Sequence, residues 1–161
     1  MTYKNSLFII LIVLIIGCQN QNTEESSSTN TSETVYDSAL AKQIGADDYG
    51  MRTYVMANLI AGPNRDQDSI TAAKLQRAHL DNITRMAEEG TLVVAGPFMD
   101  EGDVRGIYIF AVETIAEAEE LTSTDPAIKA GRLEMELRPW YGPAALMLLK
   151  EMHPKVSKKS I

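Results

Sequence analysis

The chain has little cysteine, few aromatic residues and a deficit of positive charge. Its 161 residues include one Cys, 6% aromatic residues, and 15 Lys plus Arg against 22 Asp plus Glu, for a net charge of −7. A single cysteine cannot form an internal disulfide, which excludes a disulfide scaffold. Acidic chains repel nucleic-acid phosphates, and few aromatics leave few stacking platforms for single strands. We therefore expect no nucleic-acid partner.

The sequence also lacks motifs that would hold a phosphate, a dinucleotide or a metal ion. It contains no phosphate-binding glycine loop, no dinucleotide fingerprint and no GxSxG nucleophile elbow. The two histidines, His79 and His153, lie far apart and form no recognisable ligand set with Cys18. We therefore expect no metal and no cofactor. With 45% hydrophobic residues, the chain has the composition of one ordinary globular domain plus an appendage.

The first residues have the pattern of an export signal. Leu7 to Ile16 contains no polar residue, and as a helix it would rise about 15 Å, roughly half of a ~30 Å bilayer core. Such a run is too short to span a membrane comfortably but is typical of a signal-peptide core. The sequence Ile15-Ile16-Gly17-Cys18 then resembles a bacterial lipoprotein signal. The resemblance implies a signal peptide over residues 1–17 and lipidation of Cys18.

Gln19, rather than Asp, follows the candidate lipidated cysteine. By resemblance to bacterial lipoproteins, this favours the outer membrane, facing the periplasm, over the inner membrane. More than one acyl chain on a residue gives stable attachment, so we expect membrane contact through the lipid alone. The alternative is an ordinary signal peptide or membrane anchor with a buried thiol.

Composition divides the rest of the chain. Residues 18–34 comprise the cysteine and a tether without any further hydrophobic residue, which should be disordered because it has nothing to bury. Residues 35–48 form a short leading helix, 35–44, and a linker. The globular domain covers 49–154, and 155–161 is a basic tail.

Within the domain, hydrophobic periodicity predicts four strands and three helices. The expected order is strand 54–61, helix 70–89, strand 92–95, strand 107–112, helix 115–122, strand 133–138 ended by Pro139, and a final helix 144–152. Strand, helix, strand, strand, helix, strand is the split βαβ order of an α+β, ferredoxin-like sandwich. The first and third strands are apolar on both faces, so we expect a second copy of the sheet to cover the open face, giving a homodimer.

Five short motifs in this region resemble the YCII-related family. They are GTLVVAGP at 90–97, RGIYIF at 105–110, DPA at 125–127, GRL at 131–133 and RPW at 138–140. The resemblance implies a dimeric α+β barrel whose paired histidine and aspartate, here His79 and Asp125, line an active site. Some members or relatives act on small ring compounds, for example by dehydrochlorination, and most have no assigned reaction.

Each of the two candidate catalytic residues also has a purely structural explanation. His79 lies on the apolar stripe of its helix, where it could be a half-buried histidine with one hydrogen bond. Histidine nevertheless suits proton transfer near neutral pH. Asp125 precedes Pro126, the pattern of a helix N-cap followed by proline at the first helical position. Its functional role would be to orient the His79 ring, which requires that its second oxygen be free.

Further residues are candidates for a pocket. Gly96 and Pro97 could shape its rim, Trp140 could wall it, and Arg105 or Arg138 could pair with a substrate carboxylate. The alternatives are that the Gly-Pro pair only ends a strand, that Trp140 is core, and that the arginines are solvated surface charges.

Two functions remain open from the sequence. One is a cofactor-free acid–base enzyme, an isomerase or lyase of the dehydrochlorinase type, that acts on a small cyclic or carbonyl compound. His79 would be its general acid and base, and Asp125 would orient that ring. The other is a non-catalytic module of the bacterial cell envelope that binds a small molecule or a partner. A fold of this type cannot decide between them, because it supports unrelated functions.

Overall fold

In the computed structural model, which describes residues 35–159 and residue 161, strands and helices follow the predicted order. The signal peptide and tether predicted over 1–34 lie outside the described residues, as does Cys18. The elements are α1 (Ser38–Gln43), β1 (Met51–Ala61), α2 (Ser69–Glu89), β2 (Leu92–Pro97), β3 (Val104–Phe110), α3 (Ile115–Thr122), α4 (Pro126–Lys129), β4 (Leu133–Pro143), a 3₁₀ helix (Ala144–Leu148) and α5 (Leu149–Val156).

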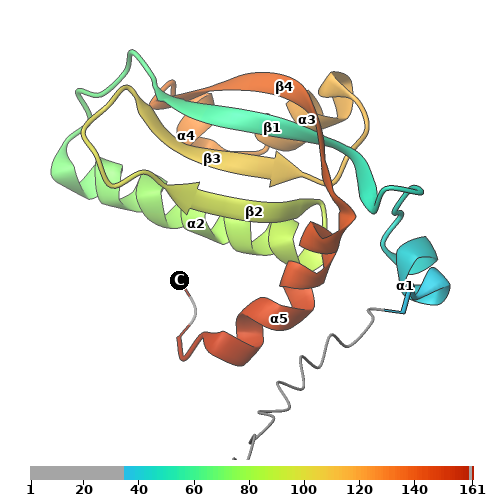
Figure 1. The fold of residues 1–161 in the computed structure, drawn as a ribbon. Coiled ribbons are helices and arrows are strands. Elements are labelled where there is room, and N and C mark those ends of the chain that lie inside the picture. Colours follow the sequence, from blue (N-terminus) through green and yellow to red (C-terminus); the bar gives the residue numbers. More distant parts are fainter. Residues whose placement is uncertain (1–34, 160) are drawn as a thin grey trace, which may run out of the picture. The chain divides into compact units, whose positions relative to one another are not determined.

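The four strands form one antiparallel sheet in the order β2-β3-β1-β4. Because β3 lies between β1 and β2, and β1 between β3 and β4, the two βαβ units interleave as in a ferredoxin-like sandwich. Helices α2, α3 and α4 all lie on one side of this sheet (Figure 1). The predicted α+β, ferredoxin-like fold is confirmed.

The core lies between the sheet and these helices. Alternation along β1 directs Val55, Ala57 and Leu59 to the same face, where they pack with Met86 of α2 and Ala118 of α3. Each of these side chains is buried, and burial of a large apolar side chain contributes about 1.5–3 kcal/mol. The core therefore fixes α2 against the sheet, and α2 carries the candidate histidine.

Strand β4 corrects one sequence prediction. The alternation expected over 133–138 is present, but the strand does not end at Pro139; it stays paired with β1 as far as Pro143. Proline is tolerated on an edge strand where its nitrogen faces outward, because no ladder hydrogen bond is lost. β4 is such an edge strand among the described residues.

Other boundaries differ from the predictions by a few residues. The leading helix, predicted over 35–44, begins at Ser38 because the Asp37 side chain caps it by accepting from the Leu40 amide at 2.9 Å. The segment 144–152, predicted as one helix, starts as the 3₁₀ helix and becomes α5, which extends to Val156. Within the part of the chain that the structure describes, no helix is long and apolar enough to cross a bilayer.

Candidate active site

Helix α2 places His79 near its middle, on the face that packs toward the sheet. The helix begins where Asp68 accepts hydrogen bonds from the amides of Ile70 and Thr71, at 2.9 and 3.0 Å. It ends at Gly90, whose φ of 81° is a left-handed conformation that glycine adopts without strain. His79 is buried, with an exposed fraction of 7%. A position fixed by two caps and a packed face gives the ring a defined orientation.

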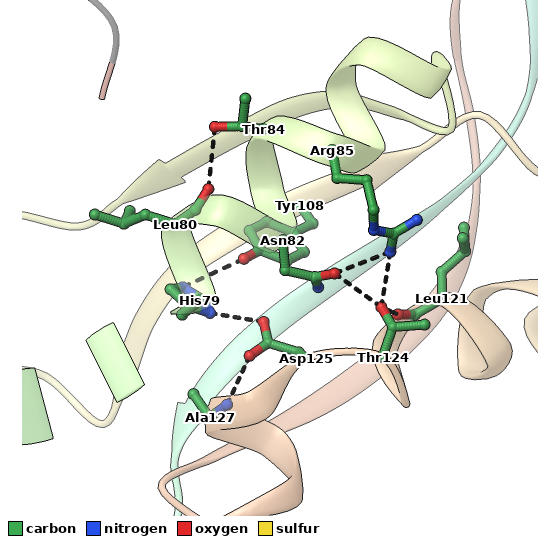
Figure 2. Close-up of polar contacts among 10 residues, drawn as sticks. All are labelled: His79, Leu80, Asn82, Thr84, Arg85, Tyr108, Leu121, Thr124, Asp125 and Ala127. Carbon is green, nitrogen blue, oxygen red and sulfur yellow. Dashed lines mark hydrogen bonds and ion pairs between the residues drawn. The ribbon is translucent and has the colours of Figure 1, made fainter. Parts of the chain in front are cut away.

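Asp125 uses its two carboxylate oxygens for two different tasks. Oδ1 accepts a hydrogen bond from the Ala127 amide at 2.8 Å and so caps α4. Oδ2 lies 2.6 Å from Nδ1 of His79, and the side chain of Asp125 is fully buried. The helix-cap role and the contact with the histidine, which the sequence presented as alternatives, are both present (Figure 2).

Tyr108 completes the site on the other side of the ring. It projects from β3, and its hydroxyl lies 3.3 Å from Nε2 of His79 (Figure 2). Burial and the nearby charge of Asp125 raise the pKa of Tyr108 well above its usual value. The phenol therefore keeps its proton and can donate it in a hydrogen bond to Nε2. If Nε2 accepts this hydrogen bond, the proton of the neutral ring is on Nδ1, which donates it to Asp125.

A second set of polar contacts links α2 to the loop that carries Asp125. Asn82, one turn after His79 on α2, accepts hydrogen bonds through Oδ1 from Arg85 at 2.9 Å and from the Thr124 hydroxyl at 3.1 Å. Thr124 immediately precedes Asp125 in the chain. The Asn82 contacts therefore hold the loop that carries Asp125 against α2 (Figure 2).

His79 and Tyr108 line a cavity of about 530 Å³ between α2 and the ends of β2 and β3. Ligand pockets in proteins span about 300–1,000 Å³, so a substituted single ring fits this volume. Of the pocket residues suggested by the sequence, Gly96, Pro97 and Arg105 all line the cavity. Most of its wall is apolar, and it includes Leu80 and Ile83 of α2 and Leu59 of β1.

Trp140 is not part of this cavity, which corrects the prediction that it walls the pocket. Its register partner on β1 is Tyr54, and the two rings pack with their centroids 5.6 Å apart. Tyr54 alternates with Val55, which faces the helices, so Tyr54 and Trp140 lie on the opposite face of the sheet. Arg138 lies outside the cavity too, exposed and ion-paired with Glu136.

The structure adds residues to the site that sequence reasoning missed. Tyr108 and Phe110 both face the core from β3, and this pattern alone is typical of an ordinary core tyrosine. Two further cavity residues, Arg65 and Arg132, come from loops whose approach no local pattern predicts. Among the described residues, no group of three or more His, Cys, Asp or Glu is placed to hold a metal ion.

These features define a class of protein: a ferredoxin-like α+β domain with a buried histidine–aspartate pair beside a cavity of small-molecule size. The model of one family, the YCII-related domain, matches residues 56–141, just over half of the chain. The protein belongs to the YCII-related family. The matched range runs from the middle of β1 through most of β4 and includes His79, Tyr108 and Asp125.

Individual proteins that are similar to this chain include one from Bacillus subtilis and one of known structure. The uncharacterized protein YjpA of Bacillus subtilis (strain 168) is 29% identical over 62 residues, which cover 38% of this chain and 71% of YjpA. Among solved structures, a complex of the 5-chloro-2-hydroxyhydroquinone dehydrochlorinase TftG from Burkholderia phenoliruptrix AC1100 with 2,5-dihydroxybenzoquinone matches with 20% identity. That match covers 55% of this chain and 93% of TftG, with a TM-score of 0.41. The family assignment rests on the family model, and the fold rests on the strand order.

Proposed function

We propose that this protein is a cofactor-independent acid–base enzyme that acts on a small cyclic or carbonyl compound. The observation that carries the proposal is the 2.6 Å contact between His79 Nδ1 and the fully buried carboxylate of Asp125, with His79 also lining the cavity. A carboxylate that holds one ring nitrogen fixes the tautomer and leaves the other nitrogen basic. Asp125 itself does not line the cavity, so it is a positioning residue.

In the proposed reaction, Nε2 of His79 removes a proton from a carbon next to a carbonyl group. The C–H electron pair moves into the carbon framework and forms an enolate, and the imidazolium that results is stabilised by Asp125. Returning the proton to a different carbon gives an isomerisation. Loss of a leaving group with its electron pair gives an elimination. The isomerisation needs only proton transfer, which the histidine supplies; the elimination also breaks the bond to the leaving group, which departs as an anion.

Tyr108 fits the same scheme as a hydrogen-bond donor. Its raised pKa keeps the phenol neutral, and the phenol lines the cavity beside His79. A neutral donor in a site shielded from water can stabilise the oxygen on which enolate charge develops. In this role the Tyr108 hydroxyl turns from Nε2 to the substrate oxygen when a substrate is bound.

The experiment follows exchange of carbon-bound protons for deuterium by NMR, using the full chain and a panel of cyclic ketones, lactones and hydroxyquinones. We expect exchange on at least one compound, and we expect His79→Gln to reduce its rate about 10²–10⁴-fold. His153→Gln is the matched control, because His153 is exposed on α5 and far in sequence from the site. Its exchange rate should equal that of the parent.

Compounds that bind in the cavity without exchange, in the parent as well as in His79→Gln, would refute the enzyme proposal. That result would favour the other function left open by the sequence, a non-catalytic envelope module that binds a small molecule. Binding is followed in the same samples through the chemical shifts of cavity residues, so the two outcomes are separable.

We further propose that the protein is a lipoprotein attached through Cys18 to the outer membrane, facing the periplasm. The support is the sequence Ile15-Ile16-Gly17-Cys18 at the end of a short apolar run, followed by Gln19. Cys18→Ser should abolish metabolic labelling with a fatty acid and release the protein from the membrane fraction. Unchanged labelling and retention would contradict the lipid anchor.

We also propose a homodimer that forms through the sheet face opposite α2. Met56, Ile60 and Ile107 alternate with core-facing residues and are only partly buried in the single chain. A second sheet would cover these side chains. Sedimentation of residues 36–161, which form one compact unit, should show a dimer at micromolar concentration, and a stable monomer would contradict the proposal.

A further inference from the structure

The arginines of the described chain fall into two groups. Outside the cavity, Arg77, Arg85 and Arg138 each form an ion pair with a carboxylate. Arg52, also outside, donates to the Ile44 carbonyl at 3.0 Å and lies over the Tyr54 ring. The three arginines that line the cavity, by contrast, form no ion pair with any described carboxylate; they are Arg65, Arg105 and Arg132.

Arg105 reaches the cavity because of an irregularity in the sheet. Gly106 pairs with Leu59 and Val104 with Ile60, so Arg105 has no partner residue on β1. Such a bulge re-aims the side chain of its extra residue. The Nε atom of Arg105 is shielded from solvent and has no hydrogen-bond partner within the described chain. Buried donors are normally satisfied. Two arginine Nε atoms of the described chain lack a partner, those of Arg52 and Arg105, and only Arg105 lines the cavity.

Arg65 and Arg132 come from two loops that touch. The Arg132 carbonyl accepts from the Gly62 amide at 3.0 Å and from the Arg65 guanidinium at 3.2 Å. A Cβ at Gly62 would lie 2.3 Å from the Gly131 carbonyl oxygen, so the loops approach this closely only because residue 62 is glycine. This contact brings both guanidinium groups to the same cavity.

The charge of the cavity is opposite to that of the chain. The chain carries a net charge of −7, yet the described residues that line the cavity include three arginines and His79 and no Asp or Glu. The three arginines have no carboxylate partner among the described residues, although Arg65 donates a hydrogen bond to the Arg132 carbonyl and Arg132 donates one to the Gln67 side chain. Arginine presents a planar fork of donors that matches a carboxylate.

We infer that the substrate carries a carboxylate and that Arg65, Arg105 and Arg132 bind it. The inference rests on the proposed acid–base function and names its substrate class: a small ring compound with a carboxylate at one end and an activated C–H at the other. The arginines hold the carboxylate, and the apolar wall from α2 covers the ring. The reacting carbon is thereby presented to Nε2 of His79.

The test compares two probes that differ in charge and little in shape, benzoate and benzamide, bound to the full chain and followed by NMR. We expect benzoate to bind at least about tenfold more tightly, because charge-assisted hydrogen bonds are the stronger class. Its affinity should also fall as salt is raised. Equal affinities for the two probes would overturn the inference.

Variants locate the binding group. Arg105→Gln and Arg132→Gln should each weaken benzoate binding about 10- to 100-fold and leave benzamide unchanged. Arg138→Gln is the matched control: it removes the same charge from β4, outside the cavity, and should bind benzoate as the parent does. Thermal unfolding checks that each variant is folded. If Arg105→Gln does not fold, Arg65→Gln tests the carboxylate site in its place, because Arg65 is exposed and also lines the cavity. Equal loss in Arg138→Gln and Arg105→Gln would refute a local carboxylate site.

The outcomes separate this inference from the proposed function. His79→Gln should retain benzoate binding while it loses deuterium exchange. Benzoate binding that depends on the arginines, without exchange on any compound, would support the anion site and refute the enzyme. Exchange on neutral ketones, together with equal binding of benzoate and benzamide, would support the enzyme and refute the carboxylate.

Discussion

The two nitrogens of the His79 ring have opposite surroundings. Nδ1 faces Asp125, which is fully buried and whose other oxygen caps α4. Nε2 faces the Tyr108 hydroxyl at the longer distance of 3.3 Å, beside the cavity. One side is therefore fixed by the fold, and the other is available to a ligand. The difference shows how a carboxylate that caps one helix can also orient a histidine ring whose other nitrogen faces a cavity.

Of the substitutions that test the two sides of the His79 ring, Asp125→Asn should have the largest effect. Asn keeps the cap on Ala127, but its amide group would donate to Nδ1 and force the ring proton onto Nε2. With the basic lone pair turned away from the substrate, we expect the exchange rate to fall about 10²–10⁴-fold. Nitrogen NMR of the ring should show the tautomer change. An unchanged ring spectrum would mean that Asp125 does not orient His79.

Asp125→Ala should have the next largest effect, this time on stability. It removes the cap and leaves Nδ1 of His79 without a partner, so we expect a loss of about 2–4 kcal/mol in the free energy of unfolding. Asp125→Asn should stay within about 1 kcal/mol of the parent because Asn caps about as well as Asp. Chemical denaturation measures both. Equal stabilities for the two variants would contradict the division of tasks between the oxygens.

Tyr108→Phe tests the open side of the ring through the pH dependence of stability. The raised pKa of Tyr108 means that the phenol ionises more readily in the unfolded chain than in the fold. The stabilisation that the buried neutral phenol gives the fold is fully present below about pH 10. It is lost as the pH rises above that value, by at most about 1.4 kcal/mol per pH unit. Denaturation at alkaline pH should show a shallower decline in Tyr108→Phe. Parallel declines would place the hydroxyl in water.

The smallest effect should come from Trp140→Leu. Trp140 packs against Tyr54 on the sheet face away from the cavity. We therefore expect its benzoate affinity to remain within about twofold of the parent, since no binding contact is lost. A loss as large as that of Arg105→Gln would show that the ligand lies on the other face of the sheet.

Sequence patterns predicted the order of elements correctly because each pattern is local. The spacing of apolar residues along 70–89 and the strand alternation of 133–138 depend on neighbours within one or two turns. The misplaced end at Pro139 has a non-local cause. Whether proline ends a strand depends on whether its nitrogen faces a partner, and only the sheet order puts β4 at an edge.

Within the site, the resemblance to the YCII-related family pointed to His79 and Asp125, and the residues themselves left a structural explanation open for each. It could not decide between them, because the residues are 46 positions apart and their separation depends on how α2 packs against α4. Tyr108 went unnoticed since a tyrosine on a core-facing strand position has the pattern of ordinary packing. Arg65 and Arg132 were not predicted as pocket residues, although Arg132 lies in the GRL motif, because their proximity depends on the contact between two distant loops.

The sequence by itself therefore determined the strands and helices, the cap at Asp125 and the acidic character of the chain. Each of these depends on residue types and short spacings. The tertiary structure decided which carboxylate oxygen contacts which nitrogen and that Tyr108 lies beside His79. It also decided that three arginines without an ion pair to any described carboxylate line one cavity in a chain of net negative charge. These are contacts between segments far apart in the chain, and only the packing of α2 and the loops against the sheet brings them together.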